Sequence, residues 1–167
     1  MVGSARIVGG LNGAGKRVAV VGARFHEEIV ERLADGAREF LLAHGVVAGD
    51  LEELRVPGAW ELPLALETLA RAGAHDLMVA LGVVVRGGTP HFEYVCAGCA
   101  QGIQRVTLDH RVPIGFGVLT CDTREQALER AGGAVGNKGE EAAQAALEMA
   151  LLLEGRKRRA TRLGEAS

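Results

Sequence analysis

Four short segments that suit β-strands, each followed by a segment with helical spacing, constrain the fold of this 167-residue chain most strongly. The first is rich in valine and ends at glycine, as expected for a strand that is buried on both faces, and the third is the most apolar of the four. The expected strands are residues 17–22, 51–56, 77–85 and 113–119. The expected helices cover residues 29–41, 60–72, 90–108, 123–131 and 139–154.

Strands that alternate with helices pair in parallel through right-handed crossovers, which place helices on both faces of an open sheet. We therefore predict an α/β fold, a three-layer αβα sandwich with a flavodoxin-like, four-stranded parallel sheet of order 2-1-3-4. The predicted domain covers residues 17–154, between a flexible arm at 1–16 and a basic, disordered tail at 155–167. In such sheets ligands bind beyond the carboxyl ends of the strands, so the corners that follow the strands are the expected site.

Charge and cysteine content narrow the possible partners. A formal net charge of -2 gives no overall case for binding nucleic acid or an anionic membrane, and no apolar run is long enough to span a bilayer. Without a signal-type stretch at the start, we expect a cytoplasmic protein. Cys96, Cys99 and Cys121 are expected to be free thiols. No second Cys or His pair accompanies Cys96 and Cys99, which favours close helix packing over a redox or metal site, so no metal is expected.

Aromatic residues gather at the corners that follow these runs. Phe25 follows the first run, Trp60 follows the second, and Phe116 stands between glycines in the fourth. A flat ligand held between rings, with backbone amides at its edge, explains this pattern. Rings that merely cap the core explain it equally well.

The third corner, RGGTPH at residues 86–91, is more specific. Thr89 is expected to cap a helix that has Pro90 in its first position. A helix start preceded by two glycines offers free N–H groups and a positive dipole end to a phosphate or another anion. His91 would lie beside that anion and is suited to proton transfer at neutral pH, although a capping or surface histidine explains it as well.

Basic residues later in the chain have ordinary explanations too. Arg124, Arg130 and Lys138 follow the fourth run, and most such charges are solvated. The basic run at residues 155–162 suits nucleic acid, a cargo or a neighbouring assembly, but a solvated end is the favoured interpretation.

Five ordered motifs resemble those of the lumazine synthase family. They are ARFH at 23–26, VPGAWELP at 56–63, GVVVRGGTPHFEYVC at 82–96, PIGFGVLTCDTREQALERAG at 113–132 and GNKGEEAA at 136–143. The resemblance implies a transferase of riboflavin biosynthesis, a 6,7-dimethyl-8-ribityllumazine synthase. Such an enzyme condenses 5-amino-6-(D-ribitylamino)uracil with 3,4-dihydroxy-2-butanone 4-phosphate, releases phosphate and water, and uses no cofactor.

The resemblance also implies roles for individual residues. His91 would be the catalytic proton-transfer residue. The pyrimidine and ribityl chain would contact Phe25, Ala59, Trp60, Glu61, Val83, Val84, Val85 and Phe116. The phosphate would be held by Gly88, Thr89 and Arg130, and His26 and Lys138 are additional candidates. His26 departs from the family pattern, because many relatives carry asparagine there.

In the resembling family, the site lies between neighbouring subunits of a homopentamer, and some members close twelve pentamers into a shell. The resemblance therefore implies that Phe116, Arg130 and Lys138 come from the chain beside the one that supplies Phe25 and His91. The expected partners are the two small-molecule substrates and further copies of the chain, with no nucleic acid and no membrane. Two other functions stay open: a catalytically silent flavin-binding, lumazine-binding or shell-forming homologue, and, less favoured, an archaeal-type riboflavin synthase.

Overall fold

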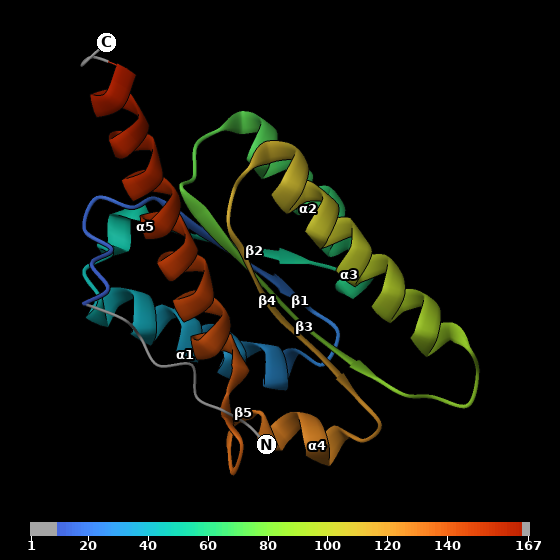
Figure 1. Cartoon of the computed structure of the whole chain (residues 1–167). Coiled ribbons are helices and arrows are strands. Elements are labelled where there is room, and N and C mark those ends of the chain that lie inside the picture. The colour runs from blue at the N-terminus through green and yellow to red at the C-terminus, as the bar shows by residue number, and fades with distance from the viewer. Residues whose placement is uncertain (1–9, 165–167) are drawn as a thin grey trace.

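The structure is a computed structural model that describes residues 10–164, with side chains described as far as Arg162. Its centre is a parallel sheet of four strands in the order β2-β1-β3-β4 (Figure 1). The strands are β1 (Val18–Ala23), β2 (Leu51–Val56), β3 (Leu77–Val85) and β4 (Ile114–Cys121). The predicted parallel sheet and its strand order are confirmed.

Helices cover both faces of this sheet (Figure 1). One face is covered by α1 (Glu27–Ala43) and α5 (Lys138–Gly164), and the other by α2 (Leu62–Ala72) and α3 (His91–His110). The shorter elements are η1 (Ala48–Asp50), η2 (Ala59–Glu61), α4 (Arg124–Glu129), β5 (Ala131–Gly133) and β6 (Gly136–Asn137). The predicted three-layer αβα sandwich is confirmed.

The strand β1 contributes to two separate cores, because successive residues of a strand point to opposite faces. Val18 and Val20 belong to the cluster beneath α1 and α5, whereas Ala19 and Val21 belong to the cluster beneath α2 and α3. All the residues of β1 are buried, as expected for a strand between two helical layers. Each fully buried valine or leucine side chain contributes about 1.5–3 kcal/mol, so the two cores hold the three layers together.

Two glycines allow α5 to approach its neighbours closely. A Cβ at Gly139 would lie 2.0 Å from the carbonyl oxygen of Leu33 in α1. A Cβ at Gly115 in β4 would lie 2.1 Å from the carbonyl oxygen of Ala142. Any side chain at either position would push the start of α5 away from the helix or the strand beside it, so this contact depends on glycine.

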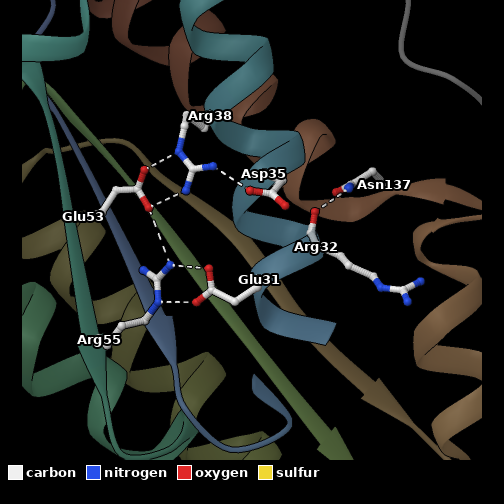
Figure 2. A network of polar contacts seen from close by, with 7 residues as sticks. All are labelled: Glu31, Arg32, Asp35, Arg38, Glu53, Arg55 and Asn137. Atoms are coloured by element: carbon white, nitrogen blue, oxygen red, sulfur yellow. Dashed lines mark hydrogen bonds and ion pairs between the residues drawn. The ribbon is translucent and has the colours of Figure 1, made fainter. Parts of the chain in front are cut away.

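An ion-pair network fastens the edge strand β2 to α1 (Figure 2). Arg38 donates hydrogen bonds of 2.5 and 2.8 Å to Glu53, and Arg55 donates bonds of 2.7 and 2.9 Å to Glu31. A longer contact of 3.5 Å from Arg55 to Glu53 joins the two pairs. The hydrogen bonds from Arg38 are the main reason that the pKa of Glu53 lies below its ordinary value. The network holds the end of β2, which leads into the second corner.

Two boundaries near the predicted site differ from the sequence predictions. The predicted cap by Thr89 is wrong: α3 begins at His91 with Pro90 as its N-cap, and no side chain caps it. Pro90 already has helical backbone angles, and its carbonyl oxygen accepts the N–H of Glu93 at 3.1 Å. The strand β4 continues to Cys121 because β3 is long enough to pair with it that far. Phe116 is therefore the third residue of β4 and does not stand at its carboxyl end.

The end of α5 and the β5–β6 pair also differ from expectation. The helix was expected to end at Glu154 but continues to Gly164, because Arg and Lys favour helices and Glu154 pairs with Arg158 one turn later. The predicted disordered tail is thus corrected for residues 155–164, while 165–167 lie outside the described residues, as do 1–9 of the predicted arm. The antiparallel β5–β6 pair was missed because its glycine-rich sequence has no apolar alternation.

Candidate active site

Three of the four corners meet around one cavity of about 650 Å³, which we call the main cavity. This volume is within the range of small-molecule sites. Its lining comes from the ends of β1, β2 and β3 and from the first turns of α3. The lining residues are Phe25, Gly58, Ala59, Trp60, Glu61, Val83, Val84, Val85, Gly87, Thr89, His91, Phe92, Tyr94 and Val95. Most of the residues predicted to bind the ring and the ribityl chain, together with the predicted proton-transfer histidine, are therefore neighbours.

The remaining predicted residues lie elsewhere in the chain. Phe116, Arg130 and Lys138 line a separate hollow of about 480 Å³ between β4 and the start of α5, which we call the β4 hollow. Gly88 lines a small hollow over the loop that follows β3. His26 lies against Phe25 and lines neither the main cavity nor the β4 hollow. Within one chain, Phe116, Arg130 and Lys138 are therefore separated from the predicted residues of the main cavity.

The end of β3 offers free backbone groups to the main cavity. β3 pairs with β1 only as far as Leu81, but it pairs with β4 as far as Val85. The N–H groups of Met78 and Arg86 bond to Pro113 and Cys121 on the β4 side, so even-numbered residues of this stretch face β4. Since backbone groups alternate along a strand, Val83 and Val85 point theirs towards the side of β1, beyond the end of that ladder. They form an open strand edge in the cavity, whereas Val84 bonds towards β4.

Large aromatic side chains stand at the rim of the main cavity. Phe25 is 69% exposed, Trp60 60% and Tyr94 73%, which is unusual for rings of this size. Trp60 packs across α3 at Gly98, where a Cβ would lie 2.3 Å from Cζ3 of the indole. Because Gly98 has no side chain, the Trp60 ring can pack closely against α3 and so lies farther from the middle of the cavity.

The first corner fixes Phe25 through its backbone. The N–H groups of Arg24 and Phe25 bond to the carbonyl oxygens of Val56 and Pro57, at 2.8 and 3.2 Å. The next residue, His26, adopts the left-handed conformation with φ 60° and ψ 43°, and its ring meets Phe25 edge-on at 5.0 Å between centroids. Asparagine and histidine are both enriched in this conformation, which accounts for histidine at a position where the family pattern has asparagine. Burial, and then the charge of Arg124, lower the pKa of His26.

The first turn of α3 carries His91 into the main cavity. Tyr94 and Val95 line the same cavity and lie three and four residues after His91, on the same face of the helix. Sequence reasoning missed both, although helical spacing from His91 points to them. The backbone N–H groups of this turn belong to a helix of 20 residues, so its positive dipole end faces the loop at Gly88 and Thr89.

The basic side chains of the β4 hollow are only partly engaged. The Nζ of Lys138 lies 2.7 and 2.8 Å from the carboxylate oxygens of Glu141. Arg130 donates to the carbonyl oxygen of Gln126 at 2.9 Å, and its nearest carboxylate, Glu129, is 3.8 Å away. The Arg130 guanidinium therefore keeps donors for an anion.

Other chemistry has little support in the described part of the chain. Within residues 10–164 no group of three or more His, Cys, Asp or Glu side chains is arranged to hold a metal ion. The three cysteines are free, and burial raises the pKa of Cys99 to about 12, so this thiol stays neutral. None of the helices in that same range is both long enough and apolar enough to cross a bilayer.

Comparisons with known proteins show which family the chain belongs to. The family profile of 6,7-dimethyl-8-ribityllumazine synthase matches residues 15–154. A protein of that name from Desulfovibrio desulfuricans is 51% identical over 148 residues, which cover 89% of this chain and 95% of the relative. One from Kineococcus radiotolerans is 56% identical over 147 residues, covering 87% and 89%, and one from Halorhodospira halophila is 53% identical over 137 residues, covering 82% and 88%.

Proposed function

The chain belongs to the 6,7-dimethyl-8-ribityllumazine synthase family, a family of transferases of riboflavin biosynthesis, and we propose that the main cavity is where it performs this reaction. The substrates are 5-amino-6-(D-ribitylamino)uracil and 3,4-dihydroxy-2-butanone 4-phosphate, and the products are the lumazine, phosphate and water. One observation carries the placement: three separate segments bring aromatic rings, an open strand edge and a histidine to a single cavity.

The uracil substrate suits the half of the cavity between Phe25 and Trp60. A flat heterocycle stacks on such rings, and its amide-like edge can pair with the free backbone groups of Val83 and Val85. Glu61 then accepts hydrogen bonds from hydroxyls of the ribityl chain, with Ala59 beside it. The backbone contacts give specificity for a pyrimidine-like donor and acceptor pattern, because an unpaired buried polar group is costly.

His91 is suited to the proton transfers. The amine of the uracil attacks the ketone to form an imine, phosphate leaves from a neighbouring carbon, and the second nitrogen closes the ring with loss of water. Each step moves a proton, and one positioned acid or base contributes about 10²–10⁴-fold. Holding both substrates in contact contributes the larger share of the rate, through orientation and lost translational freedom.

The phosphate group suits the loop before α3. Gly88 and Thr89 lie at the positive end of that helix, where backbone N–H groups are available. Arg130 supplies a guanidinium with free donors, but it lies in the β4 hollow of the same chain. The complete site therefore combines the main cavity of one subunit with the β4 hollow of its neighbour, which adds Phe116 and Lys138.

The surface around β4 supports such an assembly. Leu108 is 66% exposed, Phe116 47% and Met149 45%, and these side chains line apolar hollows between α3, β4 and α5. Apolar surface gathered in this way marks an interaction site. We propose a homopentamer in the cytoplasm whose sites lie between adjacent subunits, with closure into a twelve-pentamer shell as a further step.

Two experiments test this proposal. The purified protein is mixed with both substrates while lumazine fluorescence and phosphate release are followed; formation of both products is expected. Their absence at saturating substrate would leave a silent lumazine or flavin binder. Co-assembly of His91→Ala with Arg130→Ala subunits then tests the shared site: activity above that of either parent is expected. Activity equal to the mean of the parents would place both residues in the site of one chain.

A further inference from the structure

The segment that presents His91 to the main cavity is not held by burial. Every residue from Arg86 to His91 is exposed, and the buried side chains of α3 begin only at Cys99. A Cβ at Gly87 or Gly88 would meet no heavy atom within 4 Å. Since little packing within the chain holds this loop, polar contacts contribute to where the first turn of α3 stands.

Arg86 contacts the end of β4 and the first turn of α3. Its backbone N–H bonds to the carbonyl oxygen of Cys121 at 2.9 Å, which extends the β3–β4 ladder by one step. Its Nε donates to Asp122 at 2.8 Å, and its Nη1 donates to Glu93 in the first turn of α3. Its guanidinium carbon lies 4.3 Å from the centroid of the Phe92 ring, a cation–π contact.

The residues that make these contacts lie on either side of His91 in the sequence. His91 precedes Phe92 and Glu93, so the guanidinium of Arg86 holds the two residues that follow it on the helix. Phe92 itself lines the main cavity, whereas Arg86 does not. The side chain of Arg86 thus connects the ends of β3 and β4 to one wall of the cavity without entering it.

We infer that Arg86 is a positioning residue, which sets the place of His91 for the reaction through its contacts with Phe92 and Glu93. This inference rests on the proposed function of the main cavity. Arg86 lines the small hollow at Gly88 and Thr89, but we do not assign it as a phosphate ligand, because the carboxylates of Glu93 and Asp122 already balance its charge. The free guanidinium that suits the phosphate is that of Arg130.

The test compares Arg86→Met with the parent by steady-state kinetics. Methionine keeps much of the length but removes the ion pairs and the cation–π contact. We expect kcat to fall about tenfold, because a misplaced catalytic group is costly even over about 1 Å. The KM values of both substrates should stay within about twofold, the change expected when ground-state binding is retained. Arg86→Lys, which keeps the charge but loses the forked geometry, should recover part of kcat.

A double-mutant cycle separates positioning from general destabilisation. In the His91→Ala background, Arg86→Met should cause little further loss, because the group that it positions is already absent. Arg71→Met is the matched control: Arg71 also pairs with a carboxylate, Glu67, but lies on α2 and lines no hollow described above. It should leave both constants unchanged.

Each outcome decides the inference. Three results would overturn it: unchanged kinetics in Arg86→Met, a loss that adds in full to that of His91→Ala, or a loss confined to the KM of the phosphorylated substrate. The last of these would make Arg86 a phosphate ligand. If the parent forms lumazine and His91→Ala impairs it, the proposed function stands even when the role of Arg86 fails.

Discussion

Replacing Gly98 by alanine is expected to narrow the main cavity without unfolding the protein. The new Cβ would lie 2.3 Å from Cζ3 of Trp60 and 3.1 Å from two further ring carbons. An ordinary carbon–carbon contact is about 3.5–4.0 Å, so the ring edge must move by more than about 1 Å. Trp60 is 60% exposed and lines the main cavity, so its ring can swing away from α3 on the side of the cavity.

The expected result is weaker binding of the ring ligand at nearly unchanged stability. The free protein relieves the overpacking by moving the ring, but a ligand that pushes the ring back restores it at about 1–3 kcal/mol, and about 1.4 kcal/mol corresponds to tenfold in affinity. We therefore expect the Kd for 6,7-dimethyl-8-ribityllumazine, measured by fluorescence titration, to rise about tenfold or more. Alanine gains about 0.5–1 kcal/mol over glycine in a helix, which offsets part of the strain, so the melting temperature should change little.

Two controls make this prediction refutable. Gly155→Ala lies on α5, where a Cβ meets nothing within 4 Å, and it should raise the melting temperature without changing the Kd. In the Trp60→Ala background, Gly98→Ala should have no further effect on binding, because the colliding ring is gone. Parental affinity in Gly98→Ala, or an equal loss in the Trp60→Ala background, would show that the ring does not set the width of the cavity.

Three further predictions concern catalysis and stability. His91→Ala should lower kcat by about 10²–10⁴-fold in the fluorescence and phosphate-release assay yet leave measurable activity; complete loss with intact binding would contradict the dominance of positioning. Arg130→Ala should mainly raise the KM of the phosphorylated substrate, and a loss confined to kcat would exclude a binding role. Glu53→Gln should make unfolding less sensitive to acid. Arg38 lowers the pKa of Glu53, so the ionised carboxylate stabilises the fold. This contribution is fully present at pH values above the ordinary pKa of glutamate, near 4.5, and it is lost as the pH falls through the lowered pKa. Denaturant unfolding at pH 7 and pH 3 should differ less in the variant than in the parent.

The sheet could be predicted from the sequence because strand segments alternate with segments of helical spacing, and because β1 and β3 are strongly apolar. The bounds of β2 and β3 agree with the predicted 51–56 and 77–85. The end of β4 depends on a tertiary contact, because β4 continues to Cys121 by pairing with β3 that far. The β5–β6 pair has no apolar pattern to reveal it.

The sequence predicted which corners form the candidate site. It did not show that the predicted residues fall into separate places of one chain, the main cavity and the β4 hollow among them. Parallel strands place Phe25, Trp60 and His91 at the same edge of the sheet, which periodicity and the position of the corners reveal. Phe116 was expected at that edge too, but it lies early in β4 and faces the β4 hollow. Only the resemblance to a family suggested that this residue serves a neighbouring chain. The contacts of Arg86 depend on Asp122, 36 positions away, which no local pattern discloses.

The open edge of β3 has a consequence for how ligand selectivity can change. In the proposed site, Val83 and Val85 contact the ligand through peptide groups, which every amino acid except proline supplies in full. Replacing these valines by other residues would change the size of the side chains near the ligand. It would not change the order of backbone hydrogen-bond donors and acceptors that the ligand meets. Most substitutions of Val83 or Val85 would therefore leave the hydrogen-bonding pattern offered to the ligand unchanged. Changing that pattern requires a shift of the strand or the loss of an N–H group to proline.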